Sequence, residues 1–321
     1  MKLMTNVDIE PCQSFLIDHR RPILMLGSCF SDSIGVRLRE RLFNVDINPF
    51  GTLYNPVSIL RAVERIVNLE YITEDDIFED NGVWHTWAHH SSFSSTNPDE
   101  LIAKANARID KAHDEIHNGA TLVITYGTAY YYELVDSGKV VANCHKQPSW
   151  LFERKMCDDF GYLKLIGDMT QCPIVVTVSP IRHLADGAHG NTLSKARLHQ
   201  VIDSDLHCND TFHNRCSYFP AFEIMMDELR DYRFYAPDMV HPSEQAVDYI
   251  YDAFERTYCD PLTQEISAQA LSLCRRINHR LLIADDPRNA SFVEETNRQI
   301  EELISKYPFL ADRINRIKND K

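Results

Sequence analysis

The sequence predicts a three-layer α/β/α sandwich around a parallel sheet, with a flavodoxin-like topology. Two continuous apolar runs, at 23–26 and 173–178, support this prediction, because strands buried on both faces are apolar along their whole length. A third run, at 120–125, is rich in β-branched residues and suits a central strand. Amphipathic helical patterns separate the three runs, and strands that alternate with helices favour a parallel sheet covered on both faces.

The other elements follow in chain order. After Gly27, the residues Ile34, Leu38 and Leu42 recur at helical spacing, and 43–47 predicts a second strand that ends in a loop at 48–56. Helices are predicted at 57–69, 98–117, around 150–165, 196–206 and 221–229, with an irregular segment at 84–91 and a hairpin at 133–142. A short last strand at 233–235 precedes the final helix of this part of the chain.

Length, composition and charge predict a soluble cytoplasmic protein. The 321 residues, 44% of them hydrophobic, suit one large domain at 1–260 with a helical C-terminal extension at 261–321 packed on it. The formal net charge of -14 argues against nucleic acid as a partner. We expect neither a signal peptide nor a membrane span, and the nine cysteines contain no Cys-x-x-Cys pair, which favours a reducing compartment. The oligomeric state stays open.

A serine lies at the first strand-to-helix corner, where this fold class usually carries chemistry. Ser28 follows Gly27, and ligands of parallel sheets bind outside the carboxyl ends of the strands. A hydroxyl at a helix N-terminus also lies near unpaired backbone N–H groups. Two interpretations stand at this point. Ser28 is a nucleophile, or Ser28 or Ser31 only caps the helix, as serine often does.

A second pair of residues suits the same chemistry. Asp238 and His241 lie three residues apart, between the predicted last strand and the helix that follows. A histidine there can face the serine corner while the aspartate holds its other ring nitrogen. Ser28, His241 and Asp238 then form a nucleophile, a base and an orienting group. The alternative is that Asp238 only caps the helix that starts near Pro242.

Several motifs give the chain a family resemblance. GSCFS at 27–31 resembles the GSCFA motif of a bacterial family that is itself similar to the SGNH, or GDSL-like, hydrolases, with Ser31 in place of the final alanine. The likeness covers roughly residues 22–258 and continues in NPFGTLYNP at 48–56, TYGTAYYYE at 125–133, VANCHKQP at 141–148, VSPIRHLADG at 178–187, SKA at 194–196 and PDMVHPSEQA at 237–246. An early Gly-Ser turn with a late Asp-x-x-His pair is the SGNH arrangement.

The resemblance implies a serine esterase. Ser28 attacks an ester carbonyl, His241 takes and returns the proton, and Asp238 fixes the tautomer of His241. The implied substrate is a small-molecule or carbohydrate ester, such as an O-acetylated sugar, and neither a cofactor nor a metal is expected. An acyltransferase with the same triad, and a non-catalytic ligand-binding domain of the same fold, are the alternatives.

The oxyanion donors are only partly implied by the resemblance. The N–H groups of Ser28 and Gly51 match two donors of SGNH enzymes. The third, an asparagine side chain, has no counterpart after the predicted strand at 120–125. Thr128, the backbone near Gly127, or Asn143 is expected to take its place.

Further residues are candidates by position or type alone. Cys29, next to Ser28, is a rival nucleophile, because a thiolate at a helix N-terminus is stabilised. The tyrosines at 130–132 either stack on a sugar ring or pack the hairpin. The histidine-rich and tryptophan-rich segment lacks metal-binding spacing and indicates a substrate wall or a plain loop. The predicted substrate-binding residues are Asn48, Trp87, His89, His145, Arg182 and His183.

Overall fold

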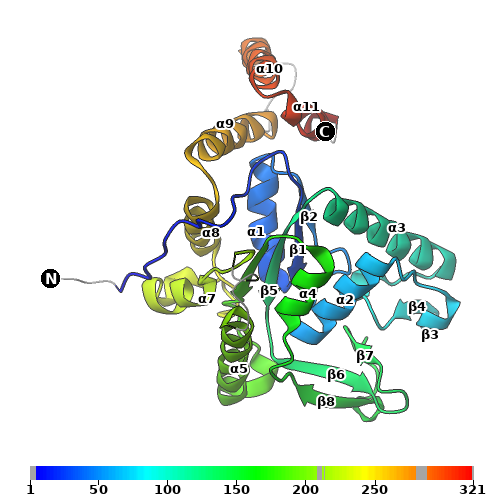
Figure 1. Cartoon of the computed structure of the whole chain (residues 1–321). Coiled ribbons are helices and arrows are strands. Elements are labelled where there is room, and N and C mark those ends of the chain that lie inside the picture. The colour runs from blue at the N-terminus through cyan, green and yellow to red at the C-terminus, as the bar shows by residue number, and fades with distance from the viewer. Residues whose placement is uncertain (1–4, 208–211, 213, 280–287, 320–321) are drawn as a thin grey trace.

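A parallel sheet forms the centre of the molecule. The computed structural model describes residues 5–207, 212, 214–279 and 288–319 (Figure 1). Its five-stranded sheet has the order β10-β9-β5-β1-β2. The strands are β1 (Ile23–Gly27), β2 (Val45–Ile47), β5 (Thr121–Tyr126), β9 (Ile174–Val178) and β10 (Cys216–Tyr218), all parallel to their neighbours. Numbered among themselves, these strands follow the flavodoxin-like order 2-1-3-4-5. The predicted fold class is confirmed.

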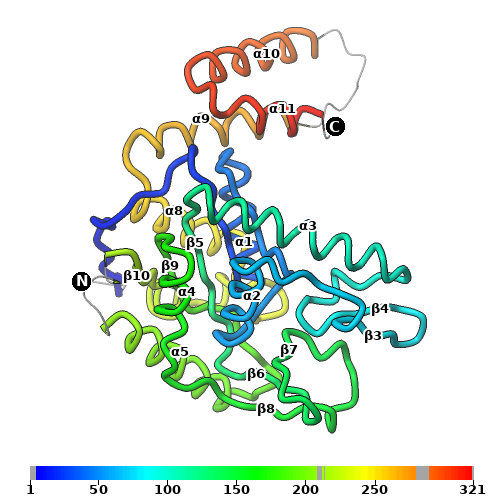
Figure 2. Tube along the Cα trace, turned by 45° about the vertical axis from the view of Figure 1, so that its right-hand side comes forward, coloured from blue at the N-terminus to red at the C-terminus, as the bar shows by residue number. Residues whose placement is uncertain are grey.

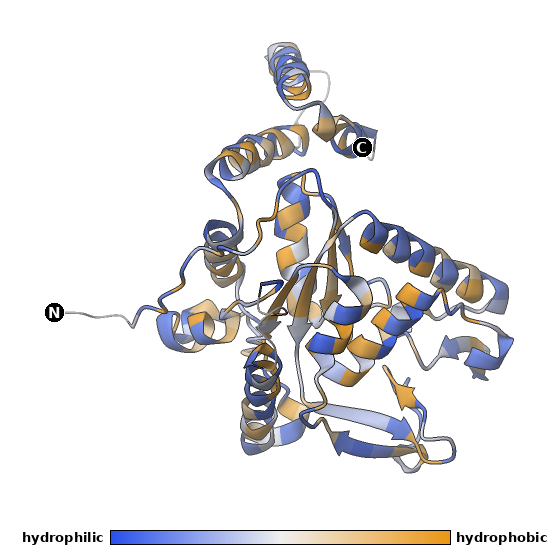
Figure 3. Ribbon diagram, in the orientation of Figure 1, coloured by the Kyte–Doolittle hydropathy of each residue, from blue (hydrophilic) through white to orange (hydrophobic). Residues whose placement is uncertain are grey.

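Helices cover both faces of this sheet, which explains why its three central strands, β1, β5 and β9, are buried at every position. Leu24 and Leu26 of β1 belong to one core, and Ile23 and Met25 to the other, because successive side chains of a strand point to opposite faces. The first core is covered by α2 (Pro56–Asn68), α3 (Pro98–His117), α4 (Tyr162–Thr170) and α5 (Gly187–His207), and the second by α1 (Cys29–Glu40) and α8 (Glu244–Tyr258). Figure 3 shows mixed hydropathy around these helices, as expected for helices that bury one side.

Two small antiparallel sheets flank the core. β3 (Ile77–Asp80) pairs with β4 (Val83–Thr86), while β6 (Tyr130–Leu134) pairs with β7 (Val140–Val141) and β8 (Phe152–Met156). Because β6 begins soon after β5 ends, the second small sheet lies beside the carboxyl end of a central strand. Figure 2 shows β6, β7 and β8 together at that end of the molecule.

Three predicted segments were wrong. The segment 233–235 is no strand, since η6 (Tyr232–Phe234) is a 3-10 turn, and the last strand is β10, which is too short to give an apolar run. The first part of the predicted helix around 150–165 is the turn η3 (Ser149–Leu151) and β8, whose residues pair with β6, and only its end, from Tyr162, belongs to α4. Part of the irregular segment 84–91 is β4, followed by the turn η2 (Ser91–Phe93).

Short helical turns connect the larger elements. They are η1 (Glu74–Asp76), η4 (Leu184–Asp186), α7 (Ala221–Glu223) and the π-helical turn η5 (Ile224–Glu228). α7 and η5 together correspond to the predicted helix at 221–229. The turn η4 matters most for the site, because it follows β9 and begins directly after His183.

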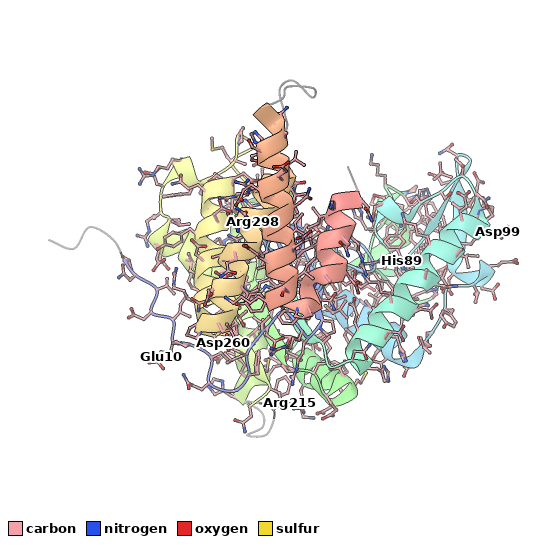
Figure 4. All side chains as sticks on the ribbon, turned by 90° about the horizontal axis from the view of Figure 1, so that it is seen from above. Glu10, His89, Asp99, Arg215, Asp260 and Arg298 are labelled. Atoms are coloured by element: carbon pink, nitrogen blue, oxygen red, sulfur yellow. The ribbon has the colours of Figure 1, made fainter. Side chains whose placement is uncertain are left out.

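The C-terminal helices pack at the end of α1 that lies away from Ser28. α9 (Pro261–Ile277), α10 (Arg288–Lys306), η7 (Pro308–Leu310) and α11 (Ala311–Asn319) bury a separate apolar cluster that reaches Leu42, just beyond α1. Figure 4 shows α9, α10 and α11 side by side from above. The division into 1–260 and 261–321 stays a prediction. No helix in the described part of the chain has the length and hydropathy to cross a membrane.

Candidate active site

The corner between β1 and α1 is held tightly by hydrogen bonds. Gly27 approaches β5 so closely that a methyl group on it would lie 2.4 Å from Thr125 O. Asn48 accepts a hydrogen bond from Gly27 N at 2.9 Å and donates one to Asp32 Oδ1 at 2.8 Å. Asn48 was predicted to bind substrate, but both ends of its amide hold this corner and it does not line the cavity described below.

Ser28 is the N-cap of α1. Its Oγ accepts a hydrogen bond from Phe30 N at 3.3 Å, and its own N–H donates to Thr125 O at 3.2 Å. The side chain is buried, with 1% of its surface exposed. The hydroxyl and the N–H of Ser28 therefore both make hydrogen bonds within the corner between β1 and α1, as expected if Ser28 caps the helix.

The residue that contacts His241 is Cys29. Its Sγ lies 3.5 Å from His241 Nε2, which is within hydrogen-bonding distance for a thiol. The sequence-based mechanism instead required Ser28 to contact this nitrogen. The structural reason is local: an N-cap side chain turns back over the first helical N–H groups, whereas the next residue along the helix points outward. The corner thus presents a thiol to the histidine.

Asp238 holds the other side of the same imidazole. Its Oδ2 lies 2.6 Å from His241 Nδ1, and its Oδ1 accepts hydrogen bonds from the N–H groups of Val240 at 2.9 Å and His241 at 3.0 Å. The backbone N–H groups of His241 and Val240 lower the pKa of Asp238 to about 2. Ser243, not Asp238, caps α8. Asp238 is therefore an ionised group that orients His241.

The environment of Cys29 favours its neutral thiol. Burial raises the pKa of Cys29 above the ordinary cysteine value, and the negative charge of Asp32 raises it further. The backbone N–H groups of Cys29 and Phe30, and the charge of Lys195, act in the opposite direction. The thiol thus needs a base to become a nucleophile, and His241 Nε2 is in place to accept its proton.

Cys29 and His241 both line a cavity of about 410 Å³. Its walls come from the corner after β1, the small sheet β6–β8, the loop after β9 and the loop before α8. Tyr130 and Tyr132 form part of the wall, with the guanidinium of Arg154 3.6 Å from the centre of the Tyr130 ring. A larger cavity of about 560 Å³ beside α2 contains neither Cys29 nor His241. The smaller cavity is therefore the candidate active site.

A sequence model of the GSCFA family matches residues 22–254. The chain belongs to the GSCFA family. No curated protein and no solved structure matched the chain. The match runs from the start of β1 into α8, so that this GSCFA segment contains the corner, the walls of the cavity and the Asp238–His241 pair, and excludes the three C-terminal helices.

Three of the predicted oxyanion donors in this GSCFA chain already make hydrogen bonds: the N–H of Ser28, which donates to Thr125 O at 3.2 Å, the N–H of Gly51 and the hydroxyl of Thr128. The N–H of Gly51 donates to Asn48 O at 2.8 Å, which corrects its assignment as a free donor. Thr128 lines the cavity, but its Oγ1 contacts Ser194 Oγ at 3.0 Å and accepts a hydrogen bond from Tyr130 N at 3.2 Å. The N–H groups of Ser28 and Gly51 therefore donate within the protein, and the hydroxyl of Thr128 makes two hydrogen-bond contacts there.

Asn143 and the histidine-rich segment lie outside the cavity. Asn143 Oδ1 accepts a hydrogen bond from His145 N, while His145 Nε2 contacts Thr86 O at 2.9 Å. Trp87 stacks on a phenylalanine ring 3.9 Å away, and His89 is completely buried, where burial lowers its pKa to about 3. These four residues pack the region around β4 and do not form the expected substrate wall. Among the described residues no group suited to a metal ion is found.

Arg182 and His183, which were predicted to bind substrate, line the cavity. Tyr54, Asn55 and Cys144 line it as well, although none of them was predicted from the sequence as a site residue. Asn55 caps α2 through Oδ1, which accepts a hydrogen bond from Ser58 N at 2.8 Å. The signal for Tyr54 and Asn55 was their place in the motif at 48–56, and that for Cys144 was its place in the motif at 141–148.

Proposed function

We propose that this GSCFA protein is an acyl hydrolase in which Cys29 is the nucleophile, His241 the general base and Asp238 the group that orients His241. The observation that carries the proposal is the 3.5 Å contact between Cys29 Sγ and His241 Nε2 in a cavity. A nucleophile, a base within hydrogen-bonding reach and a third group behind the base form the general pattern of nucleophilic catalysis. Ser28 keeps its role as the helix cap.

The reaction follows from the positions of the three groups. His241 Nε2 takes the thiol proton, and Cys29 Sγ adds to the carbonyl carbon of an ester, whose π electrons move to the carbonyl oxygen. The oxyanion then collapses, the bond to the alcohol oxygen breaks, and His241 returns its proton to that oxygen. Water, which gives a proton to His241 Nε2, next adds to the carbonyl carbon of the thioester. When this second oxyanion collapses, the bond to Cys29 Sγ breaks and His241 returns the proton to the sulfur.

Kinship with the SGNH hydrolases is part of the proposal. A nucleophile at the first strand-to-helix corner and an Asp-x-x-His pair before the last helix of the α/β domain are the features that support it. In this chain a thiol takes the place of the hydroxyl. A small acyl ester, including an O-acetylated carbohydrate, suits a cavity of about 410 Å³ with Tyr130 and Tyr132 in its wall.

A thiol nucleophile also suits the proposed cytoplasmic location, because a reducing compartment keeps Cys29 free. All cysteines of the described chain are free thiols in the structure. The proposed nucleophile therefore has no disulfide partner among them.

Turnover of short-chain nitrophenyl esters by the purified full-length chain tests the proposal. We expect the parent to hydrolyse them and His241→Ala to be slower by about 10²–10⁴, since a positioned base contributes that much. Added imidazole should restore part of the lost rate. His117→Ala, an exposed histidine at the end of α3, is the matched control and should keep the parent rate. A parent chain without any turnover would instead favour the binding-domain hypothesis.

A further inference from the structure

Acyl transfer at Cys29 needs hydrogen-bond donors for the negative charge that develops on the carbonyl oxygen. The N–H of Cys29, in the first turn of α1, lies next to its own thiol and makes no backbone hydrogen bond within the described residues. The N–H groups of Gly127 and Thr128 both donate to Tyr54 O, at 2.7 and 2.9 Å. We therefore infer the second donor from the side chains in the cavity wall.

His183 occupies the required place. A methyl group on Gly127 would lie 3.2 Å from His183 Nε2 and 3.3 Å from Ser28 Cβ, so that the imidazole and the nucleophile corner face each other across this glycine. His183, Cys29 and His241 line the same cavity. Within the described residues, neither ring nitrogen of His183 has a hydrogen-bond partner. An imidazole in this position has an N–H available for a ligand.

The ring of His183 is held from two sides. The backbone N–H of His183 donates to Asn191 Oδ1 at 3.0 Å, which fixes the start of η4. The ring of Tyr54 meets the imidazole edge-on, with their centres 5.5 Å apart and their planes at 89°. An oxyanion donor has to be held in position before the reaction. The hydrogen bond of His183 N and the contact with the Tyr54 ring hold the imidazole in position, and neither contact uses a ring nitrogen.

His183 is also electrically suited to donate without acting as a second base. Burial lowers its pKa to about 4, and the positive charge of Lys195 contributes in the same direction. The imidazole is therefore neutral at physiological pH and carries one N–H. His241, in contrast, has its Nδ1 against the Asp238 carboxylate. The two histidines of the cavity thus have different environments and suit different tasks.

We propose that His183 is a catalytic residue of this site, whose Nε2–H donates a hydrogen bond to the oxyanion formed when Cys29 attacks an acyl carbonyl. The inference rests on the proposed acyl-hydrolase function. When Sγ bonds to the carbonyl carbon, the π electron pair moves to oxygen, where Cys29 N–H and His183 Nε2–H bind it. Collapse returns the pair to the carbonyl and releases the alcohol, so that His183 keeps its own proton throughout.

Two reactions of the Cys29 thiol distinguish an oxyanion-donor role of His183 from a structural role. Nitrophenyl acetate acylates Cys29 through an oxyanion, whereas iodoacetamide alkylates it by displacing iodide at a saturated carbon, with no oxyanion. We expect His183→Phe to slow acylation by about 10²–10³ and to leave alkylation at the parent rate. His183→Gln keeps an N–H donor and should recover part of the acylation rate. His189→Phe, an exposed histidine in the first turn of α5, is the matched control.

Each other outcome overturns the proposal in its own way. Parent-like acylation of His183→Phe would show that another group stabilises the oxyanion, while the proposed function stands. An equal loss of acylation and alkylation would make His183 a structural residue of the corner. A parent chain that is alkylated at Cys29 but never acylated would overturn the proposed function together with this inference.

Discussion

Cys29 Sγ lies 3.5 Å from His241 Nε2, although 212 positions separate the two residues along the chain. The two side chains come from the corner after β1 and the loop before α8, at the carboxyl-end side of the sheet where parallel α/β proteins bind ligands. Behind His241, the carboxylate of Asp238 fixes the imidazole. The geometry therefore makes separate predictions for the thiol, for the base and for the orienting group.

Replacing Cys29 and Ser28 one at a time distinguishes the two nucleophiles. Cys29→Ala should abolish ester hydrolysis, because it removes the only hydrogen-bond partner of His241 Nε2 among the described residues. Ser28→Ala should keep turnover and lose about 1 kcal/mol of unfolding free energy with its cap. Steady-state rates and thermal unfolding measure the two effects. Full activity of Cys29→Ala with an inactive, folded Ser28→Ala would restore the serine mechanism.

The pH dependence of alkylation tests the link between Cys29 and His241. Burial raises the pKa of Cys29, so an unaided thiolate forms only above the ordinary cysteine value of about 8.5. In the parent, His241 accepts the proton, and iodoacetamide should label Cys29 at neutral pH. In His241→Ala the same labelling should require alkaline solution. Peptide mapping identifies the labelled cysteine and distinguishes Cys29 from Cys144, which lines the same cavity. Identical pH profiles for both proteins would show that His241 does not activate Cys29.

Asp238→Asn tests the orienting group with little change to the loop. The asparagine oxygen can still accept hydrogen bonds from the N–H groups of Val240 and His241. Its amide N–H₂ would face His241 Nδ1 and favour the tautomer with the proton on Nε2, which cannot accept the thiol proton. We expect kcat to fall by about 10²–10⁴, in line with the effect of the same change in other triads. Unchanged kcat, with the fold verified by circular dichroism, would mean that Asp238 only shapes the loop.

The burial of Glu115 on α3 should make the stability of the fold depend on pH, independently of the candidate active site. Burial, with help from the charge of Asp46, raises the pKa of Glu115 to about 7. Between the ordinary glutamate value and about 7, the folded chain holds a proton that the unfolded chain releases, so stability falls as the pH rises.

The change Glu115→Gln removes this effect. It should add about 1–3 kcal/mol to the unfolding free energy near pH 8 and almost nothing near pH 4. Denaturant titrations at the two pH values measure it, with the exposed Glu301→Gln as control. A loss of stability at both pH values would show that Glu115 is held ionised by Lys111, whose Nζ lies 3.7 Å away.

The fold was predictable because its strands are buried on both faces. The runs that became β1, β5 and β9 are mostly apolar or β-branched, and every residue in them is buried, as expected for strands of a parallel sheet between two helical layers. β10 escaped prediction because it is a three-residue edge strand without such a run. β8 escaped because its polar sequence, FERKM, is determined by pairing with β6 and not by burial in a core.

The sequence predicted which segments meet at the candidate site, but not which side-chain atoms contact one another there. Sequence spacing identified the corner and the Asp238–His241 pair, yet it could not tell which of two adjacent side chains turns inward. That depends on the N-cap geometry of Ser28, which sends Cys29 into the cavity. Likewise, the free imidazole of His183 and the engaged N–H of Gly51 depend on loop contacts that no periodic pattern encodes.

The central claim, that Cys29 carries the acyl group, is tested most directly by trapping the intermediate. Rapid acid quenching of the full-length chain with nitrophenyl acetate, followed by peptide mass spectrometry with fragmentation, locates the acetyl group. We predict acetylation of Cys29 as a thioester that neutral hydroxylamine removes, and none in His241→Ala on the same timescale. An acetyl group on Ser28 that resists neutral hydroxylamine would contradict the account.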